Sequence, residues 1–144
     1  MFGNPTKVSE TDLSKIGEAL KKIVLFESGQ NMTFSDRLLD FKSQSLRKEA
    51  ADLLNQVEKT EEIITKDITA DFLSSEFVPF RQVSLDLGRR SEILKMVIDG
   101  RISDGQKASE LSKEYQKMHD RLGDFENTLS SYLSKRFGQN TSVR

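Results

Sequence analysis

The residues of this chain that are best placed to do chemistry lie around its single histidine, His119. Asp120 follows it directly, and Gly123 comes four residues after it, within the stretch YQKMHDRLGDFENTL at residues 115–129. An imidazole with a nitrogen in reach of solvent and a carboxylate nearby can act as a nucleophile or accept a phosphoryl group. The other interpretation is an ordinary surface histidine, and the sequence leaves both open.

The six residues HDRLGD, which begin at His119, resemble the phosphoacceptor box of one class of sensor histidine kinases, which often reads E-L-H-D-x-L-G-Q. This resemblance implies that His119 is the phosphoacceptor of a histidine phosphotransfer-type module and that Asp120 is its acid–base neighbour. Lys117 and Met118 stand where that box has Glu-Leu. The residues that match the box are His119, Asp120, Leu122 and Gly123.

Gly123 lies in the middle of a strong helical pattern, where glycine costs roughly 1 kcal/mol relative to alanine. It could allow a neighbouring helix to approach closely. It could also mark a kink after which Asp124 restarts the helix, or it could clear space for a partner above His119. We expect one of the first two explanations to hold.

The residue inventory argues against most enzyme classes. Cysteine is absent, which excludes disulfides, thiolate metal sites and cysteine nucleophiles. A zinc site of the HExxH type needs two histidines, and a ferritin-like di-iron site needs a Glu-x-x-His on each of two helices. Gln116 stands where the glutamate of that second pattern would be. No glycine pattern for nucleotide binding is present, so we expect a protein without enzymatic activity, metal or cofactor.

The charge pattern bears on partners and location. Charged residues make up 31% of the chain but the net charge is only −1, without the basic excess that nucleic-acid binding usually shows. No expected helix sets a long cationic face against an apolar one, which argues against binding at a membrane surface. No apolar run is long enough for a signal peptide or a membrane span, so the expected location is cytoplasmic.

Apolar residues recur with a helical period along almost the whole chain. They predict helices over residues 10–28, 35–66, 79–99 and 104–137, with Gly29, Gly100 and Gly138 as the residues that end three of them. Arg90 interrupts the apolar face of the third helix, as a snorkelling or paired cation. The second and fourth helices carry the longest apolar seams, made of Leu39, Ser43, Leu46, Ala50, Leu53, Val57, Thr60 and Ile64, and of Ala108, Leu111, Tyr115, Met118, Leu122, Phe125, Leu129 and Tyr132.

Short connections between these helices favour antiparallel neighbours. We therefore expect an all-α fold, an antiparallel up-and-down four-helix bundle with coiled-coil-like packing, two long helices (the second and fourth) and two shorter ones. The whole chain, residues 1–144, forms a single domain in this interpretation, with flexible ends at about 1–8 and 138–144. The long pair would leave part of its seam uncovered unless a second subunit packs on it, which motivates the expectation of a homodimer.

Some apolar side chains exceed what an isolated bundle needs. The stretch 69–80 either closes one end of the core or forms an exposed aromatic docking patch. A protein–protein interaction module, working as an adaptor, chaperone-like protein or assembly subunit through helix-in-groove contacts, is the expected function. The expected partner-binding residues are Phe72, Phe77, Phe80, Tyr132, Leu133 and Phe137.

Overall fold

The computed structural model describes residues 10–29, 31–67 and 78–136. Most of these residues are helical and none of them is in a strand, which confirms the expected all-α class. The flexible ends predicted at about 1–8 and 138–144, and the helix end at Gly138, lie outside the described residues. The helices are α1 (Glu10–Ser28), α2 (Phe34–Arg37), the 3-10 helix η1 (Leu38–Asp40), α3 (Gln44–Asp67), α5 (Val78–Ile98) and α6 (Gly105–Arg136).

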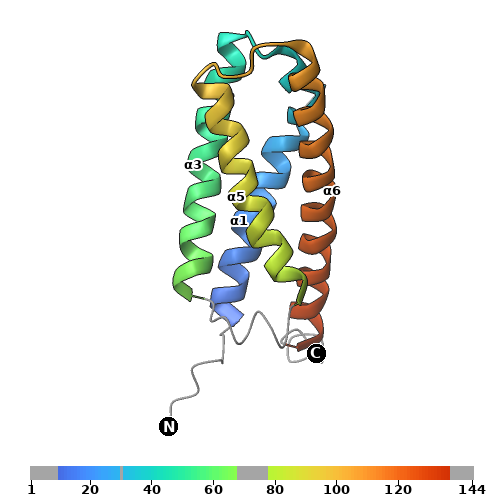
Figure 1. Ribbon diagram of the computed structural model, residues 1–144. Coiled ribbons are helices and arrows are strands. Elements are labelled where there is room, and N and C mark those ends of the chain that lie inside the picture. The colour runs from blue at the N-terminus through green and yellow to red at the C-terminus, as the bar shows by residue number, and fades with distance from the viewer. Residues whose placement is uncertain (1–9, 30, 68–77, 137–144) are drawn as a thin grey trace.

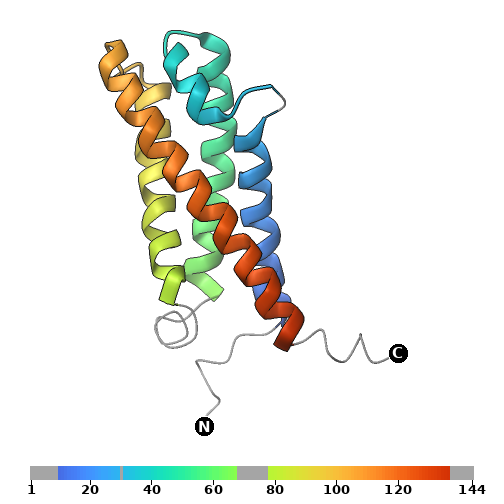
Figure 2. The same ribbon diagram turned by 90° about the vertical axis from the view of Figure 1, so that its right-hand side faces the viewer.

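The four long helices lie side by side, and α6 crosses α1 and α5 at a slant (Figures 1 and 2). Helix α3 packs against α5 and α1, and α6 packs against α1 and α5. Their buried apolar side chains, together with two from the short segment α2–η1, form one continuous core. Tyr115 and Arg90 are the largest fully buried side chains in this core, so it contains polar groups that need partners.

The first helix follows its apolar spacing closely. Leu13, Ile16, Leu20 and Ile23 are at most 1% exposed, so one face of α1 faces the core over its length. Gly29 follows with φ +61°, the left-handed conformation expected for a residue that ends a helix. A side chain at this position would collide with the carbonyl oxygen of Met32, which explains why glycine is needed there.

The prediction of one long helix over residues 35–66 is wrong. Thr33 caps α2 by accepting a hydrogen bond from the amide of Asp36 at 3.3 Å, and η1 then ends in a turn at residues 41–42. Ser43 starts a new helix by accepting from the amide of Leu46, also at 3.3 Å. Two serine/threonine caps ten residues apart thus break a repeat that the apolar spacing alone continues.

The seam changes at this break. Leu39, expected as its first member, is 52% exposed, and Ser43 is half-buried at the cap. Phe34 and Leu38 are fully buried instead, on the face of α2–η1 that packs on α6. The remaining predicted seam positions of α3 are buried as expected, and they are Leu46, Ala50, Leu53, Val57, Thr60 and Ile64.

The segment α2–η1 covers the part of α6 that extends past the end of α1. The ring of Phe34 lies 5.3 Å from the ring of Tyr115, and Ser35 donates a hydrogen bond to Gln116 at 2.5 Å. The seam positions of α6 from Ala108 to Leu129 are at most 4% exposed. The uncovered seam that motivated a homodimer is therefore not found in this part of α6, and the homodimer stays a prediction. The plain four-helix arrangement is not confirmed either, since α2 is a fifth helix.

Candidate functional site

Glu27, in the last turn of α1, is a carboxylate in the protein interior. It follows Ile23 by one helical turn, so it points to the same core-facing side, and it is only 1% exposed. The carboxyl end of a helix carries partial negative charge, which disfavours a carboxylate there. A buried carboxylate at this place therefore needs cations or hydrogen-bond donors from other helices.

Helices α5 and α6 supply these donors. Arg90 on α5, which is fully buried, donates to the carboxylate of Glu27 from Nε at 2.6 Å and from Nη2 at 3.3 Å. Tyr115 on α6 donates its hydroxyl to Glu27 at 2.7 Å. The guanidinium of Arg90 also lies 5.5 Å from the centre of the Tyr115 ring, in cation–π distance. Arg90, expected to be snorkelling or paired, is thus a paired core residue, and its Nη1 has no hydrogen-bond partner within the described part of the chain.

The surroundings keep Glu27 ionised. Burial alone raises its pKa, but the charge of Arg90 and the hydrogen bonds from His119, Arg90 and Tyr115 together hold the pKa below its ordinary value of 4.5. Burial, and then the charge of Glu27, raises the pKa of the Tyr115 hydroxyl. This hydroxyl therefore stays protonated and donates a hydrogen bond to the carboxylate. At neutral pH Glu27 is therefore an acceptor only.

His119 completes the set of groups around Glu27. Its Nδ1 lies 2.8 Å from Oε1 of Glu27. Because an ionised carboxylate cannot donate a hydrogen bond, Nδ1 carries the proton and is the donor. In the neutral ring the lone pair then sits on Nε2, which has no hydrogen-bond partner among the described residues. Nε2 is not among the buried unpartnered atoms either, and the side chain is 15% exposed, so this nitrogen reaches solvent.

Asp120, the expected acid–base neighbour, has a different contact. Its carboxylate is exposed and accepts a hydrogen bond from Nε2 of Gln116 at 3.0 Å. Among the described residues, the carboxylate that contacts the imidazole is that of Glu27, 92 positions earlier in the chain. Sequence reasoning missed Glu27 because it considered only Asp120, the neighbour in the chain, as the acid beside His119. The available signal was an acid on the apolar face of one helix and a base, Arg90, on that of another.

Gly123 lies one turn after His119 on the same side of α6, which runs without interruption through both residues. A Cβ atom placed on Gly123 would meet nothing within 4 Å. The expectation that this glycine allows close helix approach is therefore wrong, and the unbroken helix gives no support to a restart at Asp124. The open space beside His119 is the explanation that remains.

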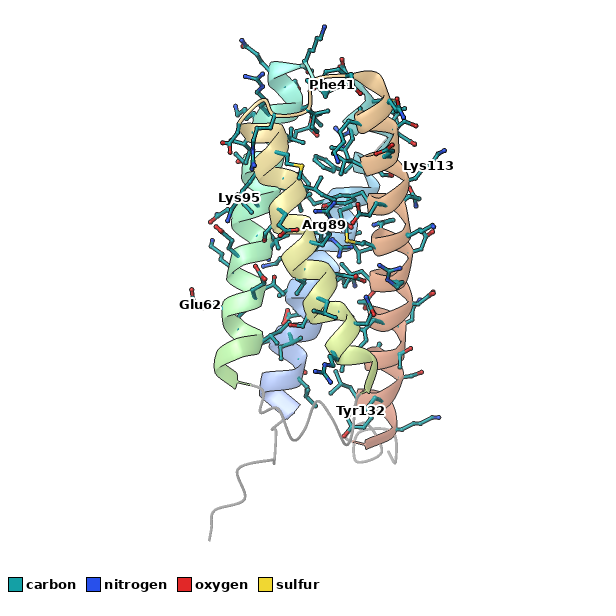
Figure 3. The ribbon with its side chains drawn as sticks, in the orientation of Figure 1. Phe41, Glu62, Arg89, Lys95, Lys113 and Tyr132 are labelled. Carbon is teal, nitrogen blue, oxygen red and sulfur yellow. The ribbon has the colours of Figure 1, made fainter. Side chains whose placement is uncertain are left out.

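The opposite flank of α6 carries a second set of charged contacts, with α5. Arg121 donates to Asp86 from Nε at 2.7 Å and from Nη2 at 2.9 Å. Arg89, which lies between α5 and α6 (Figure 3), donates to Glu114 at 2.5 and 3.0 Å. Glu114 holds the pKa of Arg89 above its ordinary value, so this guanidinium stays charged. The pair of Arg89 and Glu114 lies at the edge of the interface, since 33% and 40% of their side chains are exposed, whereas Asp86 is buried.

The predicted partner-binding residues fall into two groups. Phe72, Phe77 and Phe137 lie outside the described residues, and for Phe80 only the backbone, within α5, is described. Tyr132 and Leu133, near the carboxyl end of α6, are half-buried and pack against the core (Figure 3 labels Tyr132). The expected surface is therefore not visible as an exposed patch in the part of the chain that the structure describes.

Exposed apolar side chains gather in another region. Among the described residues, four large apolar side chains are at least half exposed, and three of them fall within residues 25–39. One of them, Met32, lines an open hollow of about 560 Å³ between the connection from α1 to α2 and the first turns of α3. Phe26 and Met32 form its apolar lining, and the ion pair of Arg37 with Glu49 borders it. The exposed apolar residues of this end are Leu25, Met32 and Leu39.

Within residues 10–29, 31–67 and 78–136, no three His, Cys, Asp or Glu side chains form a group that could hold a metal ion. Among the described helices, none combines the length and apolar character that crossing a membrane requires. Compared with protein-family models, curated proteins and solved structures, the chain shows no significant match.

Proposed function

We propose that this protein is a non-enzymatic helical interaction module, such as an adaptor, a chaperone-like protein or an assembly subunit of the cytoplasm. The proposal takes its four long helices as an antiparallel up-and-down bundle into which α2–η1 is inserted. The observation that carries it is that three exposed apolar side chains fall within residues 25–39, and that one of them, Met32, lines the hollow together with Phe26. Clustered exposed apolar surface marks binding sites more often than isolated exposed residues do.

The occupant that suits this hollow is an amphipathic helix of a partner protein. Apolar anchors of such a helix would enter between Phe26 and Met32, as in other helix-in-groove complexes. Its polar flank would meet the ion pair of Arg37 with Glu49 at the border of the hollow. This surface takes the place of the stretch at residues 69–80 as the first one to test.

Two exposed leucines provide a matched test, because Leu25 and Leu85 are both 63% exposed but only Leu25 falls within residues 25–39. The tagged protein would be used to capture a partner from native lysate, and binding of that purified partner would then be measured. We expect Leu25→Lys with Met32→Lys to weaken the partner's affinity by at least about tenfold, as substitutions in a binding centre do. Leu85→Lys should leave it unchanged.

Equal affinity for both variants would contradict the proposed surface. The mass of the purified protein in solution tests the predicted homodimer in the same preparation. A strictly monomeric protein that retains no partner would contradict the interaction function itself.

A second candidate is a histidine phosphotransfer-type module with His119 as phosphoacceptor. The observation that favours it is the hydrogen bond from Nδ1 of His119 to Glu27, which leaves Nε2 as the nitrogen that reaches solvent. Incubation with a cell extract that contains kinases should give an acid-labile phosphate on the protein, and His119→Gln should abolish it. Absence of label in both proteins would rule this candidate out.

A further inference from the structure

We propose that Glu27 is the positioning residue that fixes His119 as the Nδ1–H tautomer, so that Nε2 is a nucleophilic nitrogen open to small phosphoryl donors on the side of Gly123. This inference rests on the second candidate function and names the reacting atom, the residue that orients it and the route of access. Neither Glu27 nor Gly123 touches the donor's phosphorus in this scheme, so His119 is the sole catalytic residue.

Two other side chains hold the carboxylate of Glu27 in place. Arg90 from α5 and Tyr115 from α6 both donate to its Oε2, and Arg90 also reaches Oε1, where His119 donates. Its 1% exposure keeps water from competing for the same lone pairs. The imidazole therefore meets a fixed acceptor, and a ring flip would leave a buried lone pair of Glu27 without its donor.

The same contact favours attack by Nε2. The lone pair of Nε2 forms a bond to phosphorus, the bond from phosphorus to the leaving group breaks, and the leaving group departs with that electron pair. With phosphoramidate as donor, the leaving group is ammonia. The ring keeps its Nδ1 proton and gains positive charge, which lies 2.8 Å from the carboxylate of Glu27 across the hydrogen bond.

Gly123 supplies the access. Side chains on a helix lean toward its amino-terminal end, so a side chain at position 123 would lean over His119, one turn earlier. Glycine leaves this volume empty, since an added Cβ would meet nothing within 4 Å. Glu126, one turn later and half-buried, borders a further open hollow between α1 and α6. The exposed edge of the imidazole is therefore open on the side of α6 that carries Gly123.

Nitrogen-15 NMR of the full chain tests the tautomer without any phosphorylation. With labelled histidine at a pH where the ring is neutral, we expect the Nδ1 signal of a protonated nitrogen and the Nε2 signal of an unprotonated one. The double variant Glu27→Gln with Arg90→Met removes both charges of the buried ion pair. It replaces the carboxylate acceptor by an amide that can donate or accept a hydrogen bond. A mixture of both tautomers should appear in it. A wild-type ring protonated at Nε2 would overturn the inference.

Phosphoramidate then tests the reactivity. The wild-type protein should gain one acid-labile phosphate at Nε2 of His119, and His119→Gln should gain none. Gly123→Leu should slow the labelling by about tenfold or more, because displacement of a reactant by about one ångström costs such factors. Asn127→Leu, one turn later on the exposed side of α6, is the control and should label at the wild-type rate.

The outcomes separate the inference from the phosphotransfer function. Label from phosphoramidate but not from a cell extract would support the reactive nitrogen and count against a phosphotransfer role. Label at Nδ1, or equal rates in wild type and Gly123→Leu, would overturn the inference even if a cellular kinase phosphorylates the protein. No label from phosphoramidate would likewise overturn it, because Nε2 would then not be nucleophilic.

Discussion

The two flanks of α6 are both held by charged residues, but in different surroundings. Toward α1, the carboxylate of Glu27 is 1% exposed and receives hydrogen bonds from three other side chains. Toward α5, Arg89 and Glu114 pair at the edge of the interface, with a third or more of each side chain exposed. Both flanks use an arginine paired with a glutamate, and the two pairs differ in how deeply their side chains are buried.

This difference changes what each flank contributes. A buried ion pair is strongly destabilising when one partner is lost, because the other charge remains without water. An exposed pair loses little, because water and salt replace the missing partner. The α1 flank is therefore the one on which a single substitution should affect both the stability and the chemistry of His119.

Arg90→Met should give the largest effect. It leaves the carboxylate of Glu27 in the core without its cation, and we expect a loss of about 3–5 kcal/mol in the free energy of unfolding. Urea denaturation followed by circular dichroism would measure it. Glu27→Gln combined with Arg90→Met should recover most of this loss, because it removes both charges and also the unpartnered Nη1 of Arg90. If Arg90→Met alone were as stable as wild type, the ion pair of Glu27 and Arg90 would not contribute to the stability of the fold.

The pH dependence of stability comes next. The pKa of Glu27 is lower in the folded protein than its ordinary value of 4.5, so the unfolded chain binds the proton more tightly. Its contribution to stability is complete above about pH 4.5 and is lost as the pH falls through the folded-state pKa. Unfolding free energies measured between pH 7 and the acid range should fall more steeply for wild type than for Glu27→Gln with Arg90→Met. Equal slopes of unfolding free energy against pH in the two proteins would contradict a Glu27 that is ionised and stabilised in the folded state.

Local patterns predicted most of the fold. Apolar spacing located α1, α5 and α6 to within one residue of their bounds, and Gly29 and Gly100 adopt the positive φ angles expected where helices end. The error over residues 35–66 arose because the same apolar repeat fits one long helix or two pieces. Which of them forms is decided by the caps at Thr33 and Ser43 and by the packing of Phe34 on α6.

The candidate site was predicted only in part. The sequence predicts an imidazole with a nitrogen in reach of solvent or an ordinary surface histidine, and the side chain of His119 is 15% exposed. Its hydrogen-bond partner could not be read from neighbouring residues, since Glu27 comes from another helix. Helical periodicity places residues on a face but does not give the rotation and height of one helix against the next, and these bring Glu27, Arg90 and Tyr115 together.

Gly123→Ala should stabilise the protein modestly. The position lies within α6 with open space around it, so alanine adds helix propensity without a collision, worth about 0.5–1 kcal/mol. Thermal and urea unfolding would measure the gain. Gly29→Ala is the contrasting variant, because its positive φ and the carbonyl of Met32 make any side chain unfavourable, so this change should destabilise. A loss of stability in Gly123→Ala would show that the volume beside His119 is not free.

The smallest effect is expected on the α5 flank. A double-mutant cycle with Arg89→Met and Glu114→Gln should give a coupling energy of about 0.2–1 kcal/mol, which is typical of exposed ion pairs. Raising the salt concentration to about 1 M should reduce this coupling further, because screening then acts within about 3 Å. The corresponding cycle for Glu27 and Arg90 should keep its coupling at the same salt concentration, because ions do not enter the core. If both couplings fell equally with salt, the α1 flank would be accessible to solvent, and burial would no longer explain the difference between the two flanks.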